Sequence, residues 1–353
     1  MLKMLKKIYY ACFADQQAII LLLTIVGVAF IITVMGETVV PLLASIVIAY
    51  LLNGIMLRLE RQGCSHTLAV SLVSLLFIGI VLFALFWLLP LLWRETSNLL
   101  IELPQMVGRG QNFIMGLPQR YPTLINGSIV DHAVAVVKAG VGSLGRLFLN
   151  FSLSSVSNLI QLSIYLVLVP LSVFFILKDK VLLIQWVGCF LPTERRLVGQ
   201  VWQEINQQFG NYIRGKVIEV VIISFVSALV FVLMDLKFAV LLGVLVGLSA
   251  FIPFVGGFLV TIPVLIVAFL QWGWTAHFGY LMIAYAVIIV LDGNILVPLL
   301  FSEVMDLHPI AIISAVLFFG NLWGFWGIFF AIPLATVVKA VLTAWPSETS
   351  QVQ

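Results

Sequence analysis

The sequence predicts an all-α, polytopic transmembrane helical bundle of about eight spans, with broken or re-entrant helices in its C-terminal third. Composition supports this class, because 62% of the 353 residues are apolar and only 9% are charged, against roughly 25% charged in a soluble domain. Apolar segments also recur along nearly the whole chain. These features exclude a soluble protein with a single anchor, and the net charge of +3 gives no reason to expect a nucleic-acid partner.

Charge-poor windows define the first five candidate spans. Each has the roughly 20 residues that a helix needs to cross a bilayer: Ala18–Met35, Thr38–Leu57, Thr67–Trp93, Leu153–Leu177 and Val217–Met234. Lysines precede the first window as in a signal peptide, but its sequence lacks an Ala-x-Ala cleavage pattern, so we expect a retained helix. After Lys237 the apolar stretches are interrupted by proline and glycine rather than bounded by charge.

Lysines and arginines in the loops predict the orientation. Three lysines lie in the N-terminal tail and six basic residues lie in segment 178–216, so both segments are expected on the cytoplasmic side. Segment 94–152 is then extracytoplasmic, and Lys339 favours a cytoplasmic C-terminus. The three cysteines all fall in segments assigned to the cytoplasm, which agrees with reduced thiols. We expect a multi-pass protein of the cell inner membrane with both termini cytoplasmic.

Two segments outside the spans have helical periodicity. In the extracytoplasmic segment, apolar residues are spaced by three and four, as in a seam that packs on a partner helix: Val130, Val134, Val137, Val141 and Leu144. The partner helix belongs either to the same subunit or to a neighbouring copy in a homo-oligomer. In 198–213 apolar residues share one face, which is typical of an amphipathic helix on the membrane or beneath the bundle.

A carboxylate interrupts the longest uncharged stretch. Between Phe238 and Leu291 the chain has no Asp, Glu, Lys or Arg, and then Asp292-Gly293-Asn294 follows, with Pro298 shortly after. A carboxylate at bilayer depth costs about 2.5–3.5 kcal/mol on insertion scales, so we expect it to face a bundle interior or a watery path. Gly293 and Pro298 are expected to break the helix and free backbone groups there.

Three further carboxylates are secondary candidates for polar contacts. Glu219 lies two residues inside its window, where a side chain can snorkel to the headgroups. Glu303 and Asp306 lie closer to an expected loop.

The C-terminal third contains a weak internal repeat. The segments Gly257–Pro263 and Gly327–Pro333 share glycine, isoleucine and proline at equal spacing, 70 positions apart. Each follows a break rich in glycine and aromatic residues, which includes Pro253 and Gly256 in the first and Gly324 in the second. Interrupted helices at corresponding positions are a sequence pointer to a transporter's substrate site. Chance similarity in so apolar a chain is the alternative.

The motifs of catalysis and cofactor binding are incomplete in this sequence. Gly210-x4-Gly215-Lys216 approaches a phosphate-binding loop, but Val217 replaces the Ser or Thr that would hold magnesium. The four histidines are dispersed, and no clustered Cys/His set suggests zinc. We therefore expect neither an enzyme nor a site for ATP, a metal or a cofactor.

Several short motifs, taken together and in order, resemble those of one family. They are Phe174-Phe175-Ile176-Leu177-Lys178-Asp179, Tyr212-Ile213-Arg214-Gly215-Lys216 with Glu219, Ile252-Pro253-Phe254-Val255-Gly256, Asn294-x3-Pro298 with Leu307-His308-Pro309, and Trp323-Gly324-Phe325-Trp326-Gly327 through Pro333-Leu334. The chain resembles the autoinducer-2 exporter family of permeases, nearest its PerM-like branch, over essentially its whole length. The resemblance implies cytoplasmic termini, a homo-oligomer and export of small molecules without ATP. Some relatives are assigned autoinducer-2 export and others sodium/proton antiport.

Together these observations favour a secondary transporter that exports a small solute, autoinducer-2-like or another metabolite. Asp292 and Asn294 would contact the solute or a coupling proton or sodium ion. Gly256 and Gly257 would shape one re-entrant tip, and Gly324 and Gly327 the other. Helix breaks would form the hinges at Pro253, Pro263, Gly293, Pro298, His308, Pro309 and Pro333. The alternatives are a sodium/proton antiporter and a non-transporting oligomeric membrane scaffold.

The predicted organisation has six segments. They are three transmembrane helices in 1–93, an extracytoplasmic helical segment 94–152, a transmembrane helix 153–177, a cytoplasmic amphipathic segment 178–216, a transport core with interrupted helices 217–343 and a polar tail 344–353.

Overall fold

The computed structural model describes residues 27, 40–120, 162–189, 196–253, 255–301 and 307–344. These residues form helices joined by short turns, which confirms the all-α class. Five described helices are long and apolar enough to cross a membrane: Val40–Arg61, His66–Met106, Gln208–Leu233, Ala276–Phe301 and Pro309–Phe329. The polytopic helical membrane bundle is therefore confirmed. The window Ala18–Met35 lies outside the described residues, so the full number of spans stays a prediction.

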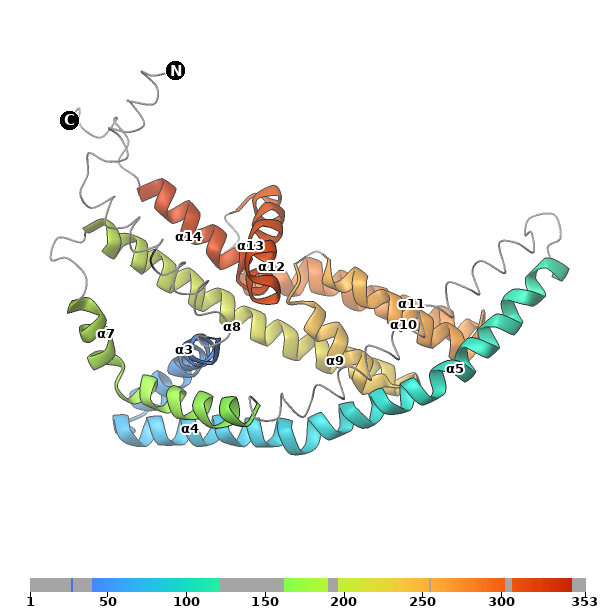
Figure 1. Ribbon diagram of the computed structural model, residues 1–353, viewed down its shortest axis with the longest axis horizontal. Helices are drawn as coiled ribbons and strands as arrows, with labels where there is room; N and C mark the ends of the chain where they lie inside the picture. Colours follow the sequence, from blue (N-terminus) through green and yellow to red (C-terminus); the bar gives the residue numbers. More distant parts are fainter. Residues whose placement is uncertain are drawn as a thin grey trace, which may run out of the picture. The chain divides into compact units, whose positions relative to one another are not determined.

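The helices follow one another along the chain as labelled in Figure 1. The first are α3 (Val40–Arg61), α4 (His66–Phe83), the π-helix η2 (Ala84–Leu88) and α5 (Leu89–Arg120). After a helix at Leu162–Lys178 come α7 (Lys180–Cys189), α8 (Arg196–Leu233), α9 (Ala239–Ser249), α10 (Gly256–Trp272) and α11 (Ala276–Leu291). The last are the π-helix η3 (Asp292–Leu296), α12 (Val297–Phe301), α13 (Pro309–Phe329) and α14 (Ala331–Ala344).

Two compact units divide these elements. Unit 1 takes its described residues from Met1–Ile78, Tyr165–Lys216 and Leu300–Gln353, and unit 2 takes them from Gly79–Ile164 and Val217–Leu299. Neither unit is a continuous stretch of the chain. Each must therefore be held together by packing between helices that are distant in sequence.

The core of unit 1 lies between α3, the first part of α4 and the Leu162–Lys178 helix. Its buried members are mostly small or β-branched, which lets neighbouring helix backbones approach closely: Ala49, Leu52, Met56, Ala69, Val70, Val73, Val173 and Leu177. Ser45 is fully buried, and its hydroxyl donates a 2.6 Å hydrogen bond to the Pro41 carbonyl. The same hydroxyl lies 3.4 Å from the Val169 carbonyl of the Leu162–Lys178 helix, so Ser45 also connects two helices of this core.

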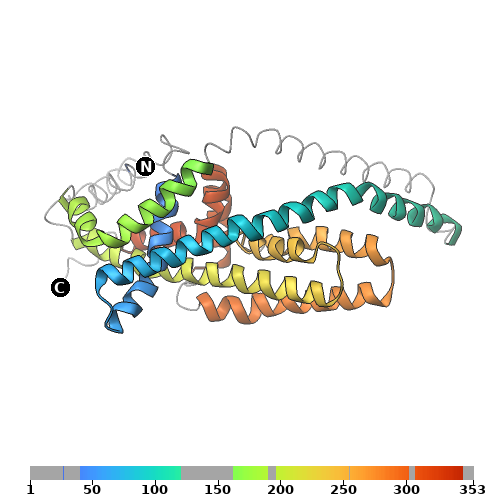
Figure 2. The same ribbon diagram turned by 90° about the horizontal axis from the view of Figure 1, so that it is seen from below.

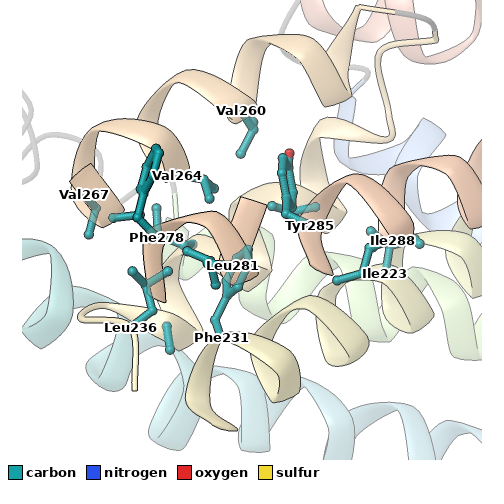
Figure 3. Close-up of a cluster of buried hydrophobic side chains, with 14 of the residues drawn as sticks. Ile223, Phe231, Leu236, Val260, Val264, Val267, Phe278, Leu281, Tyr285 and Ile288 are labelled. Carbon is teal, nitrogen blue, oxygen red and sulfur yellow. The ribbon is translucent and has the colours of Figure 1, made fainter. Parts of the chain in front are cut away.

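The core of unit 2 is larger and more aromatic (Figure 3). It draws Ile223 and Phe231 from α8, Val260 and Val264 from α10, and Leu281 and Tyr285 from α11, among others. Figures 1 and 2 show α9, α10 and α11 beside one another, in agreement with their contacts. The unit is thus built around the segment that the sequence marks as charge-free.

Two helices run further than the charge-poor windows predict. The helix that begins at His66 continues past Trp93 to Arg120, and α8 runs unbroken from Arg196 to Leu233 (Figure 2). Arginine, lysine and glutamate are good helix formers, so a charged residue ends an apolar window without ending the helix. The seam Val130, Val134, Val137, Val141 and Leu144 lies outside the described residues.

The helix break expected at Gly293 and Pro298 is wrong. The chain passes this point as a π-helix, η3, in which the Val297 amide donates to the Asp292 carbonyl five residues back. Pro90 follows η2 at the same two-residue distance, where the Leu89 amide donates to the Ala84 carbonyl. A proline ring clashes with the carbonyl four residues earlier in a regular helix. A widened turn just before each proline relieves that clash and lets the helix continue.

The other expected breaks divide into two groups. Pro263 lies inside α10 and Pro333 in the first turn of α14, so neither ends a helix. The first turn of a helix tolerates proline because its amides have no partner inside the helix. Pro253 lies in the turn between α9 and α10, and His308 caps α13, whose first residue is Pro309. The helices are interrupted at these three residues, and their role as hinges stays a prediction.

The turn between α8 and α9 is fastened by polar side chains within unit 2. Gln271 at the end of α10 donates to the Asp235 carbonyl and accepts from the Lys237 amide, both at 2.8 Å. Glu95 on α5 accepts a 2.7 Å hydrogen bond from the amide of Leu241, in the first turn of α9. The N-cap residue of α9, Phe238, has no side-chain acceptor. Glu95 therefore caps the N-terminus of α9 from another helix, because the N-cap residue of α9 cannot do so itself.

Replacing Glu95 by alanine is expected to destabilise the protein. Loss of a helix cap costs about 0.5–2 kcal/mol, and the orphaned Leu241 amide remains in the first turn of α9. Thermal unfolding in mild detergent, followed by tryptophan fluorescence, should show a lower midpoint. Glu95→Gln is the matched control, because its amide oxygen can still accept the bond. An equal loss in both variants would assign the effect to charge and not to the cap.

Candidate functional site

One side of α8 is buried and contains charge. The buried residues follow one another at intervals of three and four, so they form one stripe: Tyr212, Lys216, Glu219, Ile223, Ser227 and Phe231. The remaining surface of the same helix exposes large apolar side chains, among them Val221, Phe225 and Leu233. Polar groups inside and apolar groups outside reverse the pattern of a soluble surface helix. The exposed side of α8 is therefore suited to lipid.

Lys216 is a buried cation of unit 1. Its side chain is only 5% exposed, and its ammonium group lies 5.5 Å from the centre of the Phe301 ring. The Tyr212 ring lies 5.6 Å from that of Phe301. A cation–π contact contributes up to about 2 kcal/mol when it is desolvated, which offsets only part of the cost of burying an ammonium group. Such an expensive group is retained in a membrane helix mostly for function.

Glycine allows this close packing. A Cβ atom built on Gly215 would lie 2.9 Å from the Phe301 ring and 3.3 Å from the Leu300 carbonyl oxygen. Any larger side chain at residue 215 would push Phe301 away from α8. The neighbouring Lys216 would then lose its aromatic partner.

Tyr212 ties α8 to a hairpin in which α13 folds back on itself at Gly324 before α14 begins. Its buried hydroxyl donates a 3.0 Å hydrogen bond to the Phe329 carbonyl. One turn earlier, the Phe209 ring stacks on Phe330 with the ring centres 5.6 Å apart. The hydrogen bond satisfies a carbonyl at the end of α13, where the helix itself leaves carbonyls without partners.

In the part of the chain that the structure describes, each unit contains a helical hairpin that closes on a glycine. In unit 1 the chain reverses at Gly324, whose φ is +59°, and a Cβ atom on Gly327 would overlap the Phe319 carbonyl oxygen. In unit 2 a Cβ atom on Gly256 would overlap the Ser249 carbonyl oxygen, across the turn between α9 and α10. Both turns therefore require glycine for close backbone approach. The internal sequence repeat aligns Gly257 with Gly327, whereas in unit 2 the tight backbone contact is made by Gly256.

Asp292 and Asn294 lie in the widened turn η3 of unit 2. Asp292 is half-buried and Asn294 is exposed. The Asn294 amide donates a 2.9 Å hydrogen bond to the Val290 carbonyl, one helical turn earlier. π-turns inside α-helices are frequent at functional sites, because they displace backbone groups from the regular pattern. The structure thus gives Asp292 a special backbone setting, although not the open helix break that we expected.

A second polar group of unit 2 lies near the α9–α10 turn. The Thr261 hydroxyl donates to the Gly257 carbonyl at 2.7 Å, and the buried Tyr285 hydroxyl lies 3.3 Å from both that carbonyl and the Thr261 hydroxyl. These groups connect the start of α10 to α11 among apolar neighbours. Thr261 and Tyr285 are not among the residues predicted from the sequence, because single hydroxyl residues in apolar helices have no distinctive spacing.

The predicted site residues are distributed over both units. Asp292, Asn294, Gly256 and Gly257 belong to unit 2, whereas Gly324 and Gly327 belong to unit 1. A Cβ atom on Gly257 would meet the Ile289 side chain of α11 at 3.4 Å. The start of α10 at Gly257 therefore lies beside α11, the helix that leads to Asp292. Glu303 and Asp306 lie outside the described residues. Glu219 is 2% exposed, so the expectation that it snorkels to the headgroups is wrong.

A comparison with known families identifies the class. The model described as AI-2E family transporter matches residues 19–347. The chain belongs to this family. The resemblance drawn from the motifs around Tyr212, Pro253 and Trp323 is therefore confirmed, and the protein is a membrane transporter by family.

Individual relatives agree over most of their length. PerM of Escherichia coli (strain K12) is 45% identical over 346 residues, which cover 98% of each chain. The AI-2 transport protein TqsA of the same strain is 26% identical over 311 residues, covering 87% of this chain and 86% of TqsA. YrrI of Bacillus subtilis (strain 168) is 24% identical over 307 residues, covering 86% of this chain and 85% of YrrI.

Proposed function

We propose that this AI-2E family transporter is a secondary exporter of a small polar solute, autoinducer-2-like or another metabolite. The observation that carries the proposal is the buried, charged stripe of α8, with Lys216 and Glu219 inside a helix long enough to span the membrane. A scaffold that only recruits partners has no need of such costly buried charges. The name of TqsA, an AI-2 transport protein, supports the choice of solute class.

The other predicted residues have supporting roles in this proposal. Asp292 and Asn294 contact the solute or a coupling proton or sodium ion, and the glycine-closed hairpins at Gly256 and Gly327 shape the path. Widened or interrupted helices expose backbone groups that a polar solute can use.

The proposed arrangement in the cell follows the loop charges. The part of segment 178–216 before the spanning helix Gln208–Leu233 and both termini face the cytoplasm, and the part of segment 94–152 after Met106 lies outside. The protein is a homo-oligomer of the inner membrane. ATP and cofactors take no part in the cycle.

Sodium/proton antiport is the second candidate. The buried carboxylate of Glu219 favours it, because an antiporter needs an acidic group that binds and releases a cation during turnover. In that case the solute path would serve the ion alone.

Flux into inverted membrane vesicles tests the proposal. We expect uptake of autoinducer-2 or a related metabolite to exceed that of vesicles without the protein, and to respond to an imposed proton or sodium gradient. Ion exchange without metabolite uptake would favour the antiporter. Neither activity, in vesicles where the protein is correctly inserted and oligomeric, would favour the scaffold.

Asp292→Asn in the same assay assigns the role of the carboxylate. If Asp292 binds a coupling cation, gradient-driven flux should be lost while expression and insertion stay normal. If it only hydrogen-bonds the solute, flux should persist with weaker apparent affinity. Asn294→Asp serves as the companion variant, because it adds a charge two residues away. Wild-type flux and gradient dependence in Asp292→Asn would remove Asp292 from the mechanism.

A further inference from the structure

α7 (Lys180–Cys189) is an apolar helix whose described side chains are mostly exposed. It has ten residues, and its side chains are largely exposed, with Val181 at 67%, Ile184 at 58% and Trp186 at 61%. Ten helical residues extend about 15 Å, half the thickness of the hydrocarbon core. α7 is therefore too short to cross the bilayer, and too exposed to be a core helix of unit 1.

A charged bend separates α7 from the helix before it. The Leu162–Lys178 helix ends where the Asp179 amide bonds to Phe175, and the Asp179 carbonyl then accepts from Leu183 inside α7. Figure 1 shows α7 turning sharply away from the green helix that precedes it. A charged bend at the end of an apolar helix is typical of the headgroup level. A helix that turns off there lies along the membrane surface.

The bend is held against the ends of α3 and α4. The Lys180 ammonium donates to the Asn53 side chain at 3.3 Å. The Lys178 carbonyl lies 3.2 Å from the His66 ring, whose other nitrogen lies 2.7 Å from Glu60. These contacts fix the start of α7 relative to the end of α3.

Basic side chains surround this junction. Lys178 and Lys180 flank the bend, and Arg58 and Arg61 occupy the last turn of α3; all four are exposed. The acidic side chains beside them are Glu60, which pairs with His66, and Asp179. The described charged groups of this junction are therefore net positive, and one of them, Lys180, is the first residue of α7.

We propose that α7 and the adjoining basic junction form a binding surface for anionic phospholipid. The acyl chains cover Val181, Ile184 and Trp186, and the phosphate headgroup is bound by Lys178, Lys180, Arg58 and Arg61. Aromatic residues such as Trp186 favour the boundary between chains and headgroups. The charge complementarity selects lipid over a second copy of the chain, which would bring two positive junctions together. The surface lies on the cytoplasmic side under the proposed topology, where anionic lipids attract basic segments.

Lipid titration of the purified, full-length protein tests this surface. Unfolding midpoints are measured in detergent with added phosphatidylglycerol or, in parallel, phosphatidylcholine. Phosphatidylglycerol should raise the midpoint more. The double variant K178Q/K180Q should weaken the apparent lipid affinity by about fivefold for each lysine removed, as expected for basic residues at an anionic surface. R94Q, which removes an exposed basic residue of α5, should keep the wild-type response.

A probe on α7 provides an independent readout. A fluorophore on Ile184→Cys, with Cys12, Cys64 and Cys189 replaced by serine, is reconstituted in nanodiscs with brominated lipids. Quenching from shallow bromine positions confirms that α7 lies in the interface. The proposal is overturned if the two lipids raise the unfolding midpoint of the wild-type protein equally, or if K178Q/K180Q keeps the wild-type preference for phosphatidylglycerol. It is also overturned if brominated lipid does not quench the fluorophore and only the fluorophore on a second copy of the chain does. These results leave the transport proposal untouched, because flux is measured separately.

Discussion

Gly327→Ala is expected to disrupt the hairpin that α13 forms at Gly324, and to destabilise the protein more than a methyl group added to any other described glycine of unit 1. The added Cβ atom would overlap the backbone carbonyl of Phe319, and a backbone atom cannot rotate away as a side chain can. Overpacking of this kind typically costs about 1–3 kcal/mol, occasionally more. Thermal unfolding and gel filtration in mild detergent should show a lower midpoint and a smaller monodisperse fraction.

Gly256→Ala is expected to have the same effect on the hairpin of α9 and α10, because its Cβ atom would overlap the Ser249 carbonyl. Gly279→Ala is the matched control, since Gly279 lies inside α11 with no atom within 4 Å of an added Cβ. There alanine should be neutral or stabilising by up to about 1 kcal/mol, as helix propensity predicts. A destabilising Gly279→Ala, or a harmless Gly327→Ala, would contradict the packing argument.

Lys216→Met should abolish most of the transport activity. Methionine keeps much of the length and the contact with Phe301 while it removes the ammonium group from the buried stripe. If the charge is retained for function, flux should fall by at least about tenfold, while the protein stays monodisperse because an apolar replacement removes a desolvation cost. Glu219→Gln should lower flux to a similar extent.

Arg214→Gln is the control for these variants. Arg214 is exposed on the opposite side of α8 and bonds mainly to its own helix, at Gly210 and Asn211. Its removal should change flux by less than about twofold, as for most surface substitutions. Wild-type flux in Lys216→Met would show that the buried charge is structural. If Lys216→Met does not fold, the flux of the Glu219→Gln and Lys216→Arg variants would show whether the buried charges are needed for transport.

The class of the fold could be predicted from composition, but the ends of the helices could not. Windows without charge end at Trp93 and begin at Val217, whereas the helices continue to Arg120 and start at Arg196. Hydropathy measures where a helix can contact lipid, and backbone hydrogen bonding continues wherever the residues favour it. For this reason Glu219 was placed near a membrane surface, although it lies in the middle of a 38-residue helix.

The candidate site was predicted in part. Gly256, Gly324 and Gly327 were selected because they form unusual clusters with aromatic residues, and the structure gives each a tight turn or close contact. Lys216 was counted as a loop charge. Its spacing from Tyr212, Glu219 and Ile223 was visible in the sequence, and a search for buried stripes across the edge of the window would have found it. The contact with Phe301 could not be predicted, because it joins residues 85 positions apart.

The π-turn η3 changes which residues of the Ala276–Phe301 helix face the core. Each residue of an α-helix advances by about 100°, so one inserted residue rotates everything after it by that amount. The inward positions of α11 are Phe278, Leu281, Tyr285 and Ile288. In a regular α-helix without the π-turn, Ile295 would lie on the same inward side. In the structure Ile295 is 58% exposed, and Leu296 packs on the core instead. A hydrophobic-face calculation that assumes one uniform helix therefore assigns the lipid-facing side correctly before Asp292 and incorrectly after it.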